Sequence, residues 1–327
     1  MHIPDGYLGP LTSIAMYGAM APAWALAGRS VRGALDAKEA PAVALGAAFS
    51  FVVMLFNVPT PGGTTGHAVG AALAAIALGP AAAVIAVTVA LAIQALLFGD
   101  GGLLTLGANA FNMALVMPLA GFAVYQAVAA GAPGPGRRAL AAGLGGYVGV
   151  NLAALATAVE LGLQPALEPG HCPYGLGTTI PAMMTVHLLV VGFVEAAVTA
   201  GVVRYLARGG LGERPLAPVA ARARAAWVAL GALCLLSPLG LLAAGTAWGE
   251  WAPDELKERL GYTPPGLARL AELWKGLAPD YEAPGIASRP LGYVLSAVVG
   301  VAVVAAAGLA AARLLARRKP HGAGGAP

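Results

Sequence analysis

The first two residues of the chain carry the donors of a transition-metal site. The Met1 amine is a nitrogen donor, the backbone nitrogen of His2 lies one five-membered chelate ring away, and Nδ1 of His2 closes a six-membered ring. Three coplanar nitrogens suit Ni(II) or Cu(II), while imidazole also suits cobalt and zinc. Each donor binds only without its proton, so affinity should rise with pH near the amine and imidazole pKa values. The alternative is that His2 is an ordinary residue beside the turn of residues 3–6.

The composition is that of a membrane protein with several spans. Of 327 residues, 58% are hydrophobic and 10% are charged, whereas a soluble domain has about 25% charged residues. The first ten residues lack the basic start and the cleavage site of a secretory signal, so we expect them to be retained. Apolar stretches of about 20 residues predict an all-α bundle of about seven helices plus a C-terminal pair, over 8–28, 41–58, 67–79, 81–98, 105–129, 139–160, 180–204, 226–247 and 291–313.

The positions of Lys and Arg predict the orientation of these helices in the cytoplasmic membrane. With the N-terminus outside, fourteen of the 19 basic residues fall in inner loops and the tail, so the net charge of +4 reflects those loops rather than nucleic-acid binding. His2 and His67 then share the outer side. The Gly- and Pro-rich loop 58–66 leads into His67 at a predicted helix start, where it is either a fourth ligand or a capping residue. Helix 67–79 is short and could form a re-entrant hairpin with the next helix.

Several stretches resemble the CbiM/NikM family, the substrate-capture components of cobalt and nickel energy-coupling-factor transporters. They are MHIPDGYL at residue 1, PTPGGTTGHAVGAALAAIALGP (59–80), LLFGDGGLLTLGANAFNMALVMPLAG (96–121) and TIPAMMTVHLLVVGFVEAAVTA (179–200). The resemblance implies that Met1, His2 and His67 hold the metal. It also implies Ni²⁺ or Co²⁺ as cargo, uptake for cobalamin biosynthesis or nickel enzymes, and two kinds of partner, a membrane coupling subunit and paired cytosolic ATPases.

Four polar residues are candidates for supporting the metal ligands. Asn109 and Asn112 lie near the outer end of a predicted helix, where unpaired amides are unfavourable in a membrane. They either orient the imidazoles or cross-link helices. Thr64 and Thr65 immediately precede Gly66 and His67 and are further candidates for such support.

His187 and Glu195 lie eight residues apart in one predicted membrane helix. An ionisable group in such a helix indicates a functional role by default, and the resembled family carries a similar H-x7-E pattern. They could lock helices together or couple the chain to its partners. They could also relay protons in the alternative function, a stand-alone proton-driven metal permease. Glu160, at a predicted helix end, is expected to be solvated.

The character of the chain changes after the metal-binding domain, residues 1–204. Residues 205–225 are basic and predict a cytoplasmic linker, residues 320–327 form a tail, and 226–319 form a two-helix unit whose outer loop 248–290 contains a predicted amphipathic helix over 265–275. This unit resembles the accessory N component, of the CbiN/NikN type. The chain has no G-x-x-x-x-G-K-[ST] or H-E-x-x-H motif, so nothing in the sequence favours an enzyme. The residues do not choose between nickel and cobalt.

Overall fold

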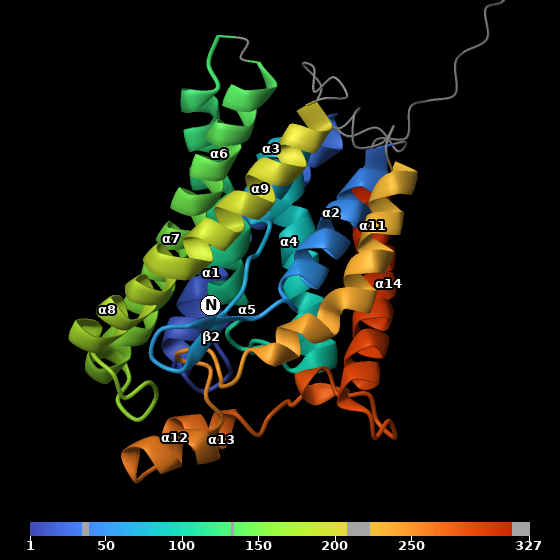
Figure 1. The fold of residues 1–327 in the computed structure, drawn as a ribbon. Coiled ribbons are helices and arrows are strands. Elements are labelled where there is room, and N and C mark those ends of the chain that lie inside the picture. The colour runs from blue at the N-terminus through green and yellow to red at the C-terminus, as the bar shows by residue number, and fades with distance from the viewer. Residues whose placement is uncertain (35–38, 132–133, 208–222, 316–327) are drawn as a thin grey trace, which may run out of the picture.

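A computed structural model describes residues 1–34, 39–131, 134–207 and 223–315 of the chain. Within these ranges the protein is a bundle of helices with one small antiparallel hairpin (Figure 1). The prediction of an all-α membrane protein is confirmed. The elements are α1 Pro10–Ala34, α2 Ala40–Val53, β1 Val58–Thr60, β2 Thr64–Gly66, α3 Ala71–Leu78, α4 Pro80–Ile93, η2 Gln94–Phe98, α5 Leu106–Asn109, η3 Ala110–Val116, α6 Met117–Val128, α7 Pro135–Leu167, α8 Leu176–Val186, η4 His187–Val191, α9 Gly192–Ala207, α11 Ala223–Leu236, η5 Ser237–Leu242, α12 Pro253–Leu260, α13 Pro265–Leu270, η6 Pro279–Tyr281 and α14 Arg289–Leu315.

Six helical segments in the described ranges are long and apolar enough to cross a membrane. They are 80–98, 106–128, 135–167, 176–206, 223–242 and 289–315. The predicted start of the third helix is wrong, because α3 has only eight residues and begins at Ala71. His67 therefore lies in an extended segment between β2 and α3, outside any helix. Only a helix of about 20 residues reaches across the bilayer, so α3 is a partial span, as its short apolar stretch indicated.

Three π-helical segments, η2, η3 and η4, interrupt the long helices. Such wide turns are rare and are often found at functional sites. Asp100 follows η2, Asn109 precedes η3, and His187 begins η4. Nothing in the apolar pattern of the sequence distinguishes these turns from ordinary α-helix.

The two ends of the bundle are formed by different parts of the chain (Figure 1). The end of α9, the start of α11, the end of α14 and the connection from α6 to α7 gather at one end, while the N-terminus and α12 and α13 lie toward the other. This arrangement agrees with the sides predicted from charge, and the cytoplasmic assignment itself stays a prediction. Most of the predicted linker and all of the tail lie outside the described residues, with Lys38, Arg208, Arg214, Arg222, Arg317, Arg318 and Lys319.

The C-terminal unit packs directly on the metal-binding domain. Helix α14 lies against α2 and α4, and α11 lies against α2. The fit is close, because a Cβ added at Gly300 would lie 2.1 Å from Cζ of Phe51. The predicted helix over 265–275 is too long: Pro265–Leu270 is helical, and a second helix at Pro253–Leu260 was not expected. Its start and stop signals were present in the sequence: Pro253 and two acidic residues open the helix, and Gly261 ends it.

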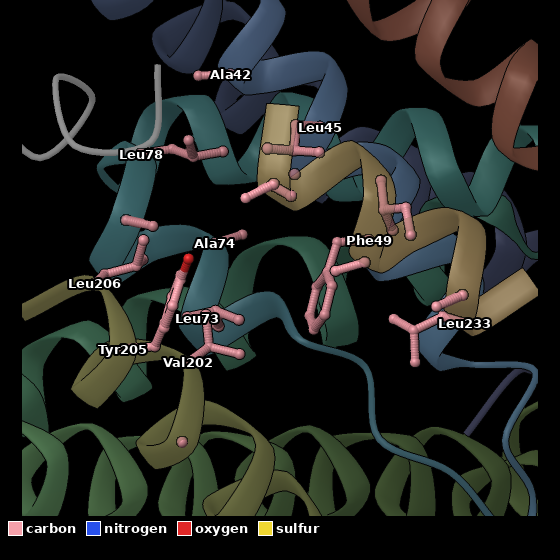
Figure 2. Close-up of a pocket in the computed structure, with 18 of the residues that line it drawn as sticks. Ala42, Leu45, Phe49, Leu73, Ala74, Leu78, Val202, Tyr205, Leu206 and Leu233 are labelled. Carbon is pink, nitrogen blue, oxygen red and sulfur yellow. The ribbon is translucent and has the colours of Figure 1, made fainter. Parts of the chain in front are cut away.

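An apolar cavity of about 490 Å³ opens between α2, α3, α9 and α11 (Figure 2). Leu45, Phe49, Leu73 and Leu233 point into it, and Tyr205 stands at its edge. None of the residues that line it is a His, Cys, Asp or Glu. It therefore has no donor for a metal, and the candidate site lies elsewhere.

Candidate metal site

The N-terminal segment is buried inside the bundle. Met1 is 5% exposed and His2 is 3% exposed. Both oxygens of the Asp5 carboxylate anchor the segment, because they accept hydrogen bonds from the backbone N–H groups of residues 103–105 at 2.8–3.1 Å. A side chain at Gly102 would prevent this, since its Cβ would lie 1.9 Å from Oδ1 of Asp5. The glycines of LLFGDGG thus let the loop after η2 close over the chain start.

Asn109 holds the residue that follows His2. Its Oδ1 accepts a hydrogen bond from the backbone N–H of Ile3 at 2.8 Å, and its Nδ2 donates to the carbonyl of Ile3 at 3.1 Å. The Thr105 hydroxyl donates to the same carbonyl at 2.5 Å. Asn109 therefore positions the backbone beside the His2 imidazole, while the hydrogen bonds of its amide go to Ile3.

The structure brings the two predicted imidazoles together. The rings of His2 and His67 are 5.2 Å apart between centroids, with planes inclined at 31°. Nδ1 of His67 lies 3.1 Å from the carbonyl oxygen of Ala68. A carbonyl can only accept, so Nδ1 carries the proton and Nε2 keeps its lone pair. Burial, helped by the Met1 ammonium and the His2 ring, lowers the pKa of His67 to about 3. His67 is therefore neutral at pH 7 and ready to bind a metal.

Glu195 fixes the backbone directly after His67. Its carboxyl oxygens accept hydrogen bonds from the N–H groups of Val69 at 2.8 Å and Gly70 at 3.1 and 3.2 Å. Both carboxyl oxygens accept hydrogen bonds from this segment. Glu195 itself is fully buried. A group on α9, 128 residues further along the chain than His67, thus holds the segment that carries the ligand.

His187 is tied within its own helix. Its Nδ1 lies 2.7 Å from the carbonyl oxygen of Met183, one turn earlier, and the ring is 4% exposed. The π-helical turn η4, which begins at His187, also packs closely against the segment that leads into His67. A Cβ added at Gly66 would lie 2.6 Å from Cγ2 of Val191. His187 and Glu195 therefore contact different parts of the structure.

Asn112 and Thr64, two other predicted supporting residues, direct their hydrogen bonds to groups other than the imidazoles. Nδ2 of Asn112 donates to Thr157 at 3.1 Å and to Glu160 at 2.8 Å, which cross-links η3 and α7. The expectation that Glu160 ends a helix and is solvated is wrong, because α7 continues to Leu167 and Glu160 is only partly exposed. The Thr64 hydroxyl donates to the carbonyl of Thr246 at 3.0 Å, and Thr65 is buried in β2.

Two carboxylates that the sequence did not single out complete the surroundings of the chain start. Oε1 of Glu250 lies 2.7 Å from the Met1 amine, and Oδ1 of Asp100 lies 3.0 Å from Nδ1 of His2. Burial acts to raise the pKa of Asp100. The His2 ring and the Tyr281 hydroxyl outweigh burial and hold this pKa well below its ordinary value. An acid between glycines at a helix end, in LLFGDGG, was the available signal for Asp100. Only the tertiary fold places Glu250 here.

An adjacent layer of side chains covers the turn after the chain start. Nδ1 of His171 lies 2.8 Å from the carbonyl of Gly6, and the Tyr7 hydroxyl donates to the carbonyl of Trp251 at 2.9 Å. Tyr7 and Trp251 belong to one buried apolar cluster, with Ile3, Leu8, Ala108, Leu161, Cys172, Leu256 and Leu267. His171 is thus bonded to the first turn, and water is excluded from one side of the segment.

Comparison with known proteins decides the family. Residues 2–210 match the family model CbiM, described as the cobalt uptake substrate-specific transmembrane region, and residues 222–317 match the PDGLE domain. The chain belongs to the CbiM family. It is 47% identical to the fused nickel transport protein NikMN of Rhodobacter capsulatus, over 97% of this chain and 99% of that one. It is 36% identical to the cobalt transport protein CbiM of Geobacter sulfurreducens, over 77% and 74% of the two chains.

Solved structures agree with this family assignment. A crystal structure described as a truncated transition metal transporter is 52% identical and has a TM-score of 0.60, over 64% of this chain and 99% of that one. His2, His67 and Asp100 lie in the CbiM region, which begins directly after Met1, whereas Glu250 and Tyr281 lie in the PDGLE region. The surroundings of the buried amine are therefore built by both regions.

Proposed function

We propose that this protein captures Ni²⁺ or Co²⁺ on the outer side of the cytoplasmic membrane and passes it inward. The supporting observation is the burial of the Met1 amine beside two imidazoles whose rings are 5.2 Å apart. Neutral His67 presents Nε2, and the amine, backbone nitrogen and imidazole of residues 1–2 can chelate one ion. Relatives described as nickel and cobalt transport proteins support both cargoes.

The proposal assigns a further role to partner proteins. The sequence has no G-x-x-x-x-G-K-[ST] motif, so in this proposal the ATP is hydrolysed by other proteins. We assign it to cytosolic ATPases and a membrane coupling subunit, as in energy-coupling-factor transporters. The charge asymmetry of the loops supports an outer N-terminus. Uptake measured in cells with and without the candidate partner subunits tests this part separately from binding.

Equilibrium dialysis of the purified full-length protein with radioactive ⁶³Ni²⁺ or ⁵⁷Co²⁺ tests capture. His2→Ala, His67→Ala and a chain extended by one residue before Met1 should each weaken binding by a factor of about 100 or more, since each removes or blocks a donor. His321→Ala, in the C-terminal tail, is the matched control and should bind as the unaltered chain does. Unchanged affinity in the extended chain would contradict the proposal.

The alternative is a proton-driven permease that uses His187 and Glu195 as a relay. Their hydrogen bonds to backbone groups of Met183, Val69 and Gly70 support a positioning role instead. Liposomes that contain only this protein separate the two functions. A pH gradient should drive no metal uptake into them, and gradient-driven uptake would favour the permease.

A further inference from the structure

Three side chains with metal-ligating atoms converge at the outer edge of the buried nitrogens. Within the described ranges, His2, Asp100 and Glu250 are the one group of three such residues, and one ligand atom from each lies within 4.8 Å of the others. Asp100 reaches the His2 ring at 3.0 Å, and Glu250 reaches the Met1 amine at 2.7 Å. Each carboxylate therefore already contacts a donor of the proposed capture site.

The group has an unused donor and an exposed side. Neither ring nitrogen of His2 has a hydrogen-bond partner in the described structure, although the residue is only 3% exposed and Nδ1 lies 3.0 Å from Oδ1 of Asp100. A buried polar atom without a partner is uncommon in folded proteins and calls for an explanation. The side chains of Asp100 and Glu250 are 21% and 16% exposed. An ion that arrives from solvent can therefore meet the carboxylates before it meets the buried nitrogens.

The surrounding residues hold Asp100 in place for this role. The Tyr281 hydroxyl donates to Oδ2 of Asp100, and Nε2 of Gln94 donates to the same oxygen at 3.3 Å. Oδ1 is left to face His2. Tyr281 reaches this position from a backbone with φ of 62°, which is unfavourable for a side chain other than glycine. Tyr281 and Glu250 both come from the outer loop of the C-terminal unit.

We infer that His2, Asp100 and Glu250 form an outer site that receives a divalent cation before the Met1, His2 and His67 nitrogens bind it. This inference rests on the proposed function. Carboxylate oxygens bind harder divalent ions well, whereas nitrogen donors favour nickel and copper. The arriving cation replaces the Met1 ammonium as the partner of Glu250. His2 belongs to both sites, so the ion moves inward by exchanging the two carboxylates for the amine and His67, and the Met1 ammonium releases its proton to water as it becomes a ligand.

The rate of nickel association tests the outer site. In full-length protein, Glu250→Gln should slow association with Ni²⁺ by about tenfold, because it removes a charge that attracts the ion. Release of bound nickel should change by less than about twofold, because the inner nitrogens are untouched. Glu258→Gln, an exposed acid in the same loop, is the control. Equal or faster association in Glu250→Gln would overturn the inference, since Glu250 would then only hold the amine.

A second measurement uses an ion that prefers oxygen. Mn²⁺ followed by electron paramagnetic resonance should still bind weakly to His67→Ala, and this binding should disappear in His67→Ala with Glu250→Gln. Absence of Mn²⁺ binding in the single variant, or its persistence in the double variant, would overturn the outer site. Failure of the proposed function gives a different result, since the unaltered protein would then bind no Ni²⁺ at the His67-dependent site.

Discussion

The carboxyl group of Glu195 can be tested by one nearly isosteric substitution, Glu195→Gln. In the native structure Oε2 accepts hydrogen bonds from the backbone N–H groups of Val69 at 2.8 Å and Gly70 at 3.1 Å, and Oε1 accepts from Gly70 at 3.2 Å. A glutamine amide offers one oxygen and one NH₂ group, so in either orientation an NH₂ group faces the N–H of Gly70. The substitution therefore disturbs the ligand segment without changing side-chain volume.

The expected effect follows from the hydrogen bonds that are lost. A hydrogen bond contributes about 0.5–1.5 kcal/mol net, and a buried donor left without an acceptor costs about 1–3 kcal/mol. A residue that orients a metal ligand typically changes affinity by about 10- to 100-fold. We expect Glu195→Gln to weaken Ni²⁺ binding by such a factor and to lower the thermal unfolding midpoint. Thr199→Val removes only the longest contact, at 3.3 Å, and should have a smaller effect on both quantities.

Two assays on the same detergent-solubilised samples separate the possible roles of Glu195. Competition with a chromophoric chelator gives the dissociation constant for Ni²⁺, and thermal unfolding gives stability without metal. If Glu195 positions His67, both quantities change in Glu195→Gln. If the unfolding midpoint falls while the dissociation constant stays the same, Glu195 only joins helices, and the reasoning from Val69 and Gly70 is refuted.

Three further predictions concern the chain start, the ligand and the C-terminal unit. Gly102→Ala should weaken Ni²⁺ binding at least tenfold in dialysis, because its Cβ displaces the Asp5 carboxylate that anchors the segment. His67, with a pKa of about 3 in the folded protein and about 6.5 when unfolded, binds fewer protons when folded. Metal-free stability should therefore fall as pH drops from about 6.5 toward 3, by up to about 1.4 kcal/mol per pH unit, and His67→Asn should flatten this slope in unfolding scans. Gly300→Val should lower stability by about 1–3 kcal/mol through overlap with Phe51, measured by thermal unfolding.

Two of these predictions have clear contrary results. Gly18 and Gly231 have no atom within 4 Å of an added Cβ, so Gly→Ala at either position should leave Ni²⁺ binding intact. If Gly102→Ala behaves like these two controls, Asp5 does not anchor the site. An equal pH slope in His67→Asn would mean that another group controls acid stability.

The sequence predicted the class of fold and the position of His2 and His67 on the same side of the membrane, and the family resemblance added their role as a pair of ligands. The lengths of the apolar stretches and the charges of the loops predict that both residues lie on one side of the membrane. Both features can be read from the sequence because they depend only on local composition. The position of His67 outside a helix was not predictable in this way. The apolar run from Ala68 continues into α3 without a break, and the hydrogen bonds by which Glu195 holds the non-helical backbone at Val69 and Gly70 come from another helix.

Asp100 and Glu250 were missed for a different physical reason. The contact between Glu250 and Met1 joins residues 249 positions apart, and no periodic pattern encodes such a contact. Its loop is irregular, so neither helix spacing nor alternation fixes where the side chain points. The packing of α14 on α2 brings the loop to the chain start, and that packing depends on the close fit of Gly300 and Phe51.

In the proposed function the chain start is a ligand, which makes docking of the N-terminal segment part of metal affinity. The amine can meet His67 only while Asp5, Ile3 and Tyr7 keep their partners. One of those partners, the carbonyl of Trp251, belongs to the outer loop of the C-terminal unit. Loop position and metal binding are therefore linked, and linkage is reciprocal: whatever moves the loop changes metal affinity, and bound metal changes the stability of the closed loop by the same free energy. Fusion of the two regions in one chain keeps the loop at a high effective concentration near the site.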